Sequence, residues 1–325
     1  MLQFSDKCST FTAEDGLLPK DELLHSSARL FLFKQIIMKY LTRFTGLLGF
    51  LTVLLTMPLG HALMIIMEKT LGHTHVYLAA FLLGFAGLLL LLLGSGLRSE
   101  NKATFAGLFA GLFIWTGWIE FGFVYIAHRY HVQPLVENGV VVTKPEYLIM
   151  PASAGFLVIM ILHYLFSTRT GCVFFSWWQK YLRIPVPRSQ PLNAQKNFAV
   201  ITAVELIALL WTFYLVLLFA YDHSFLGDRH PVTYLIAFGS LLWSLFLLRN
   251  LFRVRKMGYA IRYAIPTVVI FWNFVEIMGR WNVLEEIWVR PYEYWLEMSL
   301  VLGIFLVLFG VSLLERRGRV NSLID

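Results

Sequence analysis

Apolar residues run through this chain in long, nearly unbroken stretches, unlike the short periodic patterns of a water-soluble protein. A helix needs about 20 apolar residues to cross the hydrocarbon core of a bilayer. Eight stretches reach that length: 44–67, 76–97, 104–126, 147–168, 198–221, 232–252, 259–279 and 294–314. The pattern predicts an all-α polytopic membrane protein with about eight transmembrane helices. Arg262, near the start of the seventh stretch, is expected to extend its side chain to the membrane surface.

Composition and charge agree with a membrane protein and argue against a nucleic-acid-binding one. Of the 325 residues 58% are hydrophobic and only 14% are charged, whereas soluble domains carry roughly 25% charged residues. The net charge of +7 is spread between the apolar runs and forms no continuous basic face. Cys8 and Cys172 form no CxxC pair and are expected to be free thiols on the reducing side.

Lysine and arginine predict the orientation, because they gather in cytoplasmic loops of membrane proteins. Of the 27 basic residues, 21 fall in the two termini and the alternate connections that would share their side. We therefore expect a multi-pass protein of the cell inner membrane with both termini cytoplasmic. The predicted parts are a cytoplasmic arm at 1–43, a four-helix repeat at 44–168, a cytoplasmic linker at 169–197, a second four-helix repeat at 198–314 and a cytoplasmic tail at 315–325. Amphipathic segments at 29–41 and 173–183 are expected to lie on lipid headgroups.

The two halves resemble each other locally, which predicts a duplication. The third span reads FIWTGWIEF from Phe113, and the seventh reads IFWNFVEI from Ile270, so each carries Trp and then one Glu. The loops that follow end in KPEY and RPYEY. Halves with an even number of spans share one orientation, which gives two parallel four-helix repeats. The alternative is that Trp, Tyr and Pro gather at membrane interfaces only as anchors.

Polar side chains inside a membrane are costly and are candidates for function. The candidates within the spans are His61, Glu120, His163, Glu205 and Glu276. A helical rise of about 1.5 Å per residue places His61, Glu120 and Glu276 in the outer third. We therefore predict Glu120 and Glu276 as the catalytic pair.

Histidines near these acids suggest a divalent metal. His128 and His131 are three residues apart and would share one helix face beyond Glu120. The predicted metal site comprises His61, Glu120, His128, His131 and Glu276. The alternatives are that the loop histidines are simply solvated, and that a glutamate pairs with Arg280 or Arg129 to lock helices together.

Tryptophans close to the acids are candidates for binding a cofactor. Trp115, Trp118 and Trp272 could place aromatic ring faces beside a carboxylate, where a cationic ligand would be held. The alternative is the aromatic belt that marks every membrane interface.

These features leave more than one function open. The first is a metal-dependent membrane enzyme or a quinol-interacting redox subunit with an outward-facing site, with a divalent metal or a quinone as its cofactor and a membrane or soluble redox partner. The second is a secondary transporter, and the third is a scaffold without chemistry. Transporter sites normally lie near the midplane on broken helices. The two acids lie farther out with no central helix break near them, which favours the first class, while whether the chain is an enzyme stays open.

Overall fold

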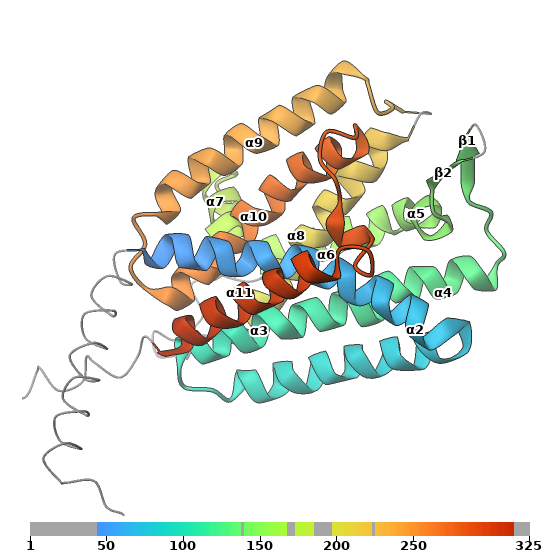
Figure 1. Cartoon of the computed structure of the whole chain (residues 1–325). Coiled ribbons are helices and arrows are strands. Elements are labelled where there is room, and N and C mark those ends of the chain that lie inside the picture. The colour runs from blue at the N-terminus through green and yellow to red at the C-terminus, as the bar shows by residue number, and fades with distance from the viewer. Residues whose placement is uncertain (1–43, 138–139, 168–172, 185–196, 223–224, 315–325) are drawn as a thin grey trace, which may run out of the picture. The chain divides into compact units, whose positions relative to one another are not determined.

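The computed structural model describes residues 44–137, 140–167, 173–184, 197–222 and 225–314, and this part of the chain is almost entirely helical (Figure 1). Within it, eight helices are long and apolar enough to cross a membrane, so the chain is a multi-pass integral membrane protein. They are Thr45–Gly72, His75–Ser95, Glu100–Arg129, Pro145–Phe166, Phe198–Tyr221, Pro231–Leu251, Met257–Arg280 and Trp295–Leu313. The predicted arm at 1–43, its segment 29–41 and the predicted tail at 315–325 lie outside the described residues.

The first half of the chain contains several interruptions of regular α-helix. Its elements are α2 (Thr45–Ser95), α3 (Glu100–Ile114), the π-helix η1 (Trp115–Glu120), α4 (Phe121–Arg129), the hairpin of β1 (Leu135–Glu137) and β2 (Val140–Thr143), α5 (Pro145–Ile149), the 3-10 helix η2 (Met150–Ser153), α6 (Ala154–Ser167) and α7 (Val173–Tyr181). The first two spans both belong to α2 and meet at Gly72, where φ is 62° and ψ is 174°. Only glycine adopts that conformation readily, so Gly72 separates the two spans.

The second half is more regular. Its elements are α8 (Phe198–Tyr221), α9 (Pro231–Leu251), α10 (Met257–Arg280), the 3-10 helix η3 (Ile287–Val289) and α11 (Trp295–Leu314). The start of α9 shows why these elements begin where they do. Pro231 occupies the first helical position, and His230 Nδ1 accepts the Val232 N–H at 3.2 Å. Proline at that position and a capping acceptor before it both favour a helix start.

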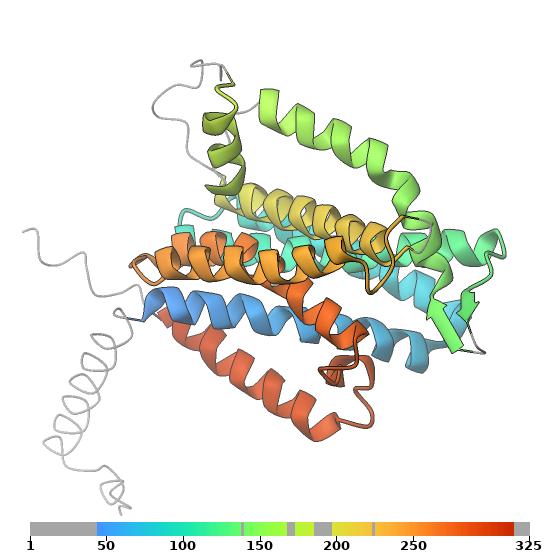
Figure 2. The same ribbon diagram turned by 90° about the horizontal axis from the view of Figure 1, so that it is seen from above.

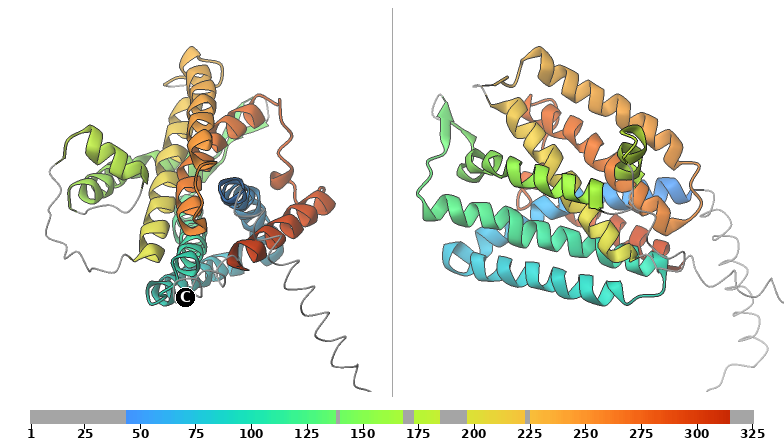
Figure 3. Two further views of the ribbon diagram at one scale, coloured as in Figure 1. Left: turned by 90° about the vertical axis from the view of Figure 1, so that its left-hand side faces the viewer. Right: turned by 180° about the vertical axis from the view of Figure 1, so that it is seen from behind.

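The seventh span, α10, lies at the centre of the bundle. It is the most buried of the eight spans and packs against α9, α2, α8 and α3 (Figure 3). It also has the lowest mean hydropathy of the eight, because a span that faces protein on all sides need not match lipid. The spans that contain α6 and α11 are the least buried of the eight, and many of their apolar side chains are exposed. Polar residues of functional interest are therefore expected around α10.

The helix α7 runs across the direction of the spans and lies beside α6 (Figure 2). It falls within the predicted amphipathic segment 173–183, with Trp177 52% exposed and Phe175 buried. An orientation across the spans is the one that a helix on the headgroups needs. Its placement at a membrane surface stays a prediction.

The two ends of the bundle hold different elements, and these elements give each end its name. The hairpin end holds Gly72, the β1–β2 hairpin and the connection from α10 to α11, and it corresponds to the side predicted to face outward. The arginine end holds Arg262 and the connections from α2 to α3 and from α9 to α10.

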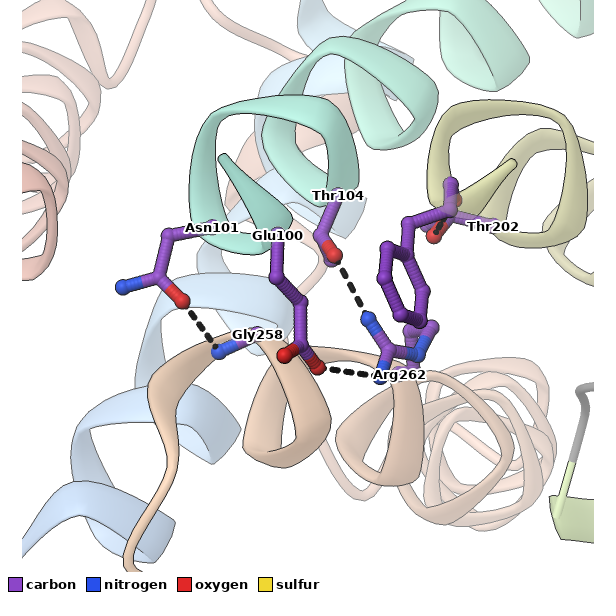
Figure 4. Close-up of polar contacts among 7 residues, drawn as sticks. Glu100, Asn101, Thr104, Thr202, Gly258 and Arg262 are labelled. Atoms are coloured by element: carbon purple, nitrogen blue, oxygen red, sulfur yellow. Dashed lines mark hydrogen bonds and ion pairs between the residues drawn. The ribbon is translucent and has the colours of Figure 1, made fainter. Parts of the chain in front are cut away.

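Arg262 does not reach for the membrane surface, and that prediction is wrong. Its side chain is 5% exposed, donates to Glu100 Oε1 and Thr104 Oγ1 at 2.7 Å each, and stacks on the ring of Phe198 at 4.4 Å (Figure 4). Beside it, the Gly258 N–H donates to Asn101 Oδ1 at 2.9 Å. Arg262 stays inside because α3 supplies a carboxylate and a hydroxyl there, which lowers the cost of burying its charge.

Candidate functional site

His61 of α2 is held in one orientation at the hairpin end. Its Nδ1 atom lies 3.1 Å from the carbonyl oxygen of Met57, one helical turn earlier. A carbonyl only accepts hydrogen bonds, so Nδ1 is assigned as the atom that carries the proton. The other ring nitrogen, Nε2, faces Glu276 Oε1 of α10 at 3.7 Å.

A proton shared between the imidazole and the carboxyl group would make this contact favourable. If His61 were neutral and Glu276 ionised, the lone pair of Nε2 would face a carboxylate oxygen, and two acceptors would oppose each other. The pair is favourable with either an imidazolium beside a carboxylate or a neutral imidazole beside a carboxylic acid. Both side chains are about three-quarters buried, which strengthens this preference. His61 and Glu276 are therefore candidates for sharing one proton.

Aromatic rings cover one side of this pair. Trp272, one turn before Glu276 on α10, donates its indole N–H to Glu276 Oε1 at 2.6 Å. The same indole stacks on His61 with ring centres 6.1 Å apart, and Trp288 packs on its other side at 4.9 Å. Trp272 is only 9% exposed. The indoles hold the Glu276 carboxyl in place and keep part of its surroundings free of water.

Glu120 is carried by the six-residue π-helix η1, which the sequence did not predict. Gly117 within η1 lies against the backbone of α2, where a Cβ atom would overlap Ala80 O and Gly84 N. Trp118 donates its indole N–H to the carbonyl of Phe81 at 3.1 Å. These contacts stabilise a turn that is wider than an α-helical one, and π-helical turns of this kind are frequent at functional sites. The third span is therefore interrupted at Glu120 by a π-helical turn, a feature that a search for central Pro or Gly breaks does not predict.

Glu120 is 6% exposed, so the residue as a whole is buried. It interacts electrostatically with His61, which links it to the Glu276 side of the site. Across the described residues, no hydrogen bond or ion pair to the Glu120 carboxyl is found. A buried carboxyl group without such a partner is costly, and this makes Glu120 a candidate for binding a ligand or a proton.

Two tyrosines, hydrogen-bonded to each other, belong to the same part of the structure. The Tyr214 hydroxyl of α8 donates to the Tyr147 hydroxyl of α5 at 3.1 Å, and the ring of Trp115 packs on Tyr214 at 5.8 Å. Both tyrosines interact electrostatically with Glu120 and with Glu276. Within the described residues, neither tyrosine hydroxyl is hydrogen-bonded to Glu120 or Glu276, so the pair adds hydroxyl groups to the site without joining the two acids.

Arg280 does not neutralise either predicted acid through a direct ion pair. Its Nε atom donates to Asp228 Oδ1 at 2.8 Å, and its guanidinium stacks on Tyr221 at 4.5 Å. Within the described ranges, neither Glu120 nor Glu276 forms an ion pair with an arginine. The alternative that these glutamates merely lock helices together through Arg280 or Arg129 is not what the structure has.

The predicted five-residue metal site is not assembled. Over the residues that the structure describes, no group of three or more His, Cys, Asp or Glu side chains is close enough to hold a metal ion. His128 and His131 are exposed at the end of α4, with ring centres 6.5 Å apart, and His128 packs on Tyr77. The physical reason is distance, because eight helical residues separate Glu120 from His128 by about 12 Å.

Of the three predicted cofactor-binding tryptophans, Trp272 contacts Glu276 directly. Trp115 packs in the core beside Tyr214, and Trp118 is 36% exposed and bonded to α2. His163 lies on the exposed face of α6, and Glu205 is fully buried in α8.

Several residues at the site are not among the site residues that the sequence predicts. They are Glu286 and Trp288 in the loop before α11, Tyr147 in α5 and Tyr214 in α8. Tyr147 belongs to the repeated KPEY motif, which was the one available signal. No family model matches this chain, and comparisons with curated proteins and with solved structures gave no match either. The geometry alone therefore carries the functional argument.

Proposed function

We propose that this membrane protein is a quinol-interacting redox subunit whose His61–Glu276 pair accepts a proton from a quinol at the outer side of the membrane. The observation that carries the proposal is the position of His61, whose Nδ1 lies 3.1 Å from the Met57 carbonyl oxygen and whose Nε2 faces Glu276 Oε1 at 3.7 Å. The indoles of Trp272 and Trp288 beside it offer flat apolar faces of the kind that suit a planar quinol ring.

The chemistry divides between this chain and a partner. Oxidation of a quinol breaks two O–H bonds and releases two protons and two electrons. One proton joins the His61–Glu276 pair, and Glu120, buried and without a hydrogen bond from a described residue, is placed to take the second. The two electrons pass to an electron-accepting cofactor in a redox partner protein. This chain then binds the quinol, orients it and accepts its protons.

The test is binding of decylubiquinol to the purified full chain in detergent, followed by quenching of tryptophan fluorescence. We expect saturable binding, and we expect Glu276→Gln and His61→Gln each to weaken it by about tenfold or more, since each removes a hydrogen bond to a charged or proton-sharing group. Glu297→Gln and His75→Gln are matched controls, because these exposed residues lie outside the site. Absence of saturable binding to the unmodified protein would overturn the proposal.

A proton-linked secondary transporter is the second candidate, favoured by the helix interruptions at the site. The π-helix η1 carries Glu120, and the 3-10 helix η2 follows Tyr147, and transporter sites are commonly built on such broken helices. Thr116→Cys, in a chain whose Cys8 and Cys172 are replaced, distinguishes the two. A transporter would expose this cysteine to a membrane-impermeant maleimide from both sides in turn, whereas the redox subunit would expose it from the outer side only.

A further inference from the structure

The loop between α10 and α11 brings one more carboxylate to the His61–Glu276 pair. Glu286 lies directly over Gly279, where a Cβ atom would overlap its carboxylate oxygen and carbon atoms. Glycine at 279 is thus what allows the loop to approach the end of α10 so closely. Glu286 is only half-buried, so it stands between the enclosed pair and the solvent at the hairpin end.

The loop is fixed on both sides of Glu286. Trp288 packs on Trp272, whose indole N–H is bonded to Glu276. On the other side, the Tyr294 hydroxyl donates to the carboxylate of Glu285. The loop also contacts α2 through η3. Glu286 is therefore held at its position by contacts of its neighbours, and its own carboxyl group stays available for proton exchange.

The charges around Glu286 come from two helices. Glu276 and Arg280 on α10 and His61 on α2 all interact electrostatically with Glu286. Burial, with the negative charge of Glu276 as the next cause, raises the pKa of Glu286 to about 7, against the opposing effects of His61 and Arg280. A carboxyl group with a pKa near neutrality both takes up and gives away a proton readily.

We propose that Glu286 releases to the outer aqueous phase the proton that the His61–Glu276 pair takes up, an inference that rests on the function proposed above. The proton leaves Nε2 of His61 for a carboxylate oxygen of Glu276. It then leaves Glu276 for the Glu286 carboxylate, and the new O–H bond of Glu286 breaks to form hydronium in the solvent. Each step breaks one bond to hydrogen and forms one, and no electron moves.

The experiment follows the protonation of His61 without any substrate. Trp272 stacks on His61, and an imidazolium quenches indole fluorescence, so a stopped-flow jump from about pH 8 to about pH 6 reports protonation of His61 as a quench. Trp272→Phe and His61→Gln should each remove this signal. Glu286→Gln should keep its amplitude and slow its rate by about tenfold or more, because an amide cannot carry the proton. Glu285→Gln, one residue away and directed at Tyr294, is the matched control and should react at the unmodified rate.

Glu286→Asp separates a proton-carrying role from a structural one. Aspartate keeps a titratable carboxyl group, so it should recover much of the rate that glutamine loses. If glutamine leaves the rate unchanged, or if aspartate and glutamine slow it equally, the proposed role is overturned. Decylubiquinol binding, measured in parallel, should stay within about threefold of the unmodified affinity in Glu286→Gln. Loss of this role alone would leave binding intact, whereas failure of the proposed function would appear as no binding in any variant.

Discussion

Two polar clusters lie on α10, one near each end, and they differ in how completely their groups are satisfied. At the arginine end, Arg262 donates to Glu100 and Thr104 at 2.7 Å each and stacks on Phe198. At the hairpin end, His61 and Glu276 are 3.7 Å apart, which is longer than a hydrogen bond.

The difference separates a structural role from a functional one. A buried charge that is matched by ideal hydrogen bonds joins helices and has little reason to bind anything else. A buried acid such as Glu120, with no hydrogen bond or ion pair from the residues that the structure describes, retains its affinity for a proton or a ligand. The contacts of Arg262 therefore fix the positions of α3, α8 and α10. Those helix positions in turn place the side chains at the hairpin end.

The largest effect is expected from breaking the arginine end. Arg262→Met removes the cation and leaves Glu100 and Thr104 without it, which should destabilise the protein by about 3 kcal/mol. Thermal unfolding in detergent, followed by circular dichroism, measures this loss. Arg249→Met is the control, since Arg249 is exposed on α9 and should be neutral. The folded fraction should still bind decylubiquinol normally, and equal unfolding temperatures of both variants would contradict a structural role.

A smaller effect is expected from filling the contact between η1 and α2. A methyl group at Gly117 would overlap the backbone of Ala80 and Gly84, so Gly117→Ala should cost about 2 kcal/mol and also weaken decylubiquinol binding by displacing Glu120. Gly122→Ala is the matched control on the same span, because a Cβ atom there meets nothing within 4 Å. Unlike Arg262→Met, Gly117→Ala should change stability and binding together. If Gly117→Ala behaves like Gly122→Ala, the π-helix does not depend on this contact.

The sequence predicts the spans well and the local geometry poorly, for one physical reason. Hydropathy is a local property, so the stretch 198–221 coincides with Phe198–Tyr221 and the other predicted spans fall on helices. The partner of Arg262 is determined by tertiary structure, because Glu100 lies 162 residues away in sequence. The prediction used only the distance of Arg262 from the helix end, and it therefore placed the side chain at the membrane surface.

The candidate site shows the same division. The cost of burying polar side chains in lipid was enough to select Glu120, Glu276 and His61 as candidates. The register of η1 depends on the approach of Gly117 to α2, and the position of Glu286 depends on Gly279. Neither contact leaves a pattern in the sequence, since many glycines in membrane helices serve only close packing. Helical phase predicts that His128 and His131 share one helix face, but it says nothing of their axial distance from Glu120.

A modest effect is expected from removing one hydrogen bond at the hairpin end. Trp272→Phe keeps a ring on His61 and deletes the N–H that Glu276 accepts at 2.6 Å. Affinity for decylubiquinol should fall by about threefold, in line with the roughly 0.6 kcal/mol of an average hydrogen bond inside a membrane protein. Trp281→Phe deletes an equivalent indole N–H bonded to the Asp228 carbonyl, and it should leave the affinity unchanged. Equal affinities of the two variants would show that Trp272 does not orient Glu276.

The smallest of the expected effects on stability is the pH dependence that Glu286 contributes. Its pKa is raised from 4.5 to about 7 in the folded protein, so the folded state holds this proton more tightly than the unfolded state does. Below about pH 4.5 both states are protonated, and between there and about pH 7 only the unfolded state loses the proton. Stability should therefore fall as pH rises through this window and level off above it, by about 1 kcal/mol after allowance for solvent screening of a half-exposed group. Unfolding temperatures across this range measure the slope, which Glu286→Gln should flatten and Glu285→Gln should leave as it is. A slope that persists in Glu286→Gln would assign the titration to another group and would weaken the contrast between a satisfied arginine end and a proton-exchanging hairpin end.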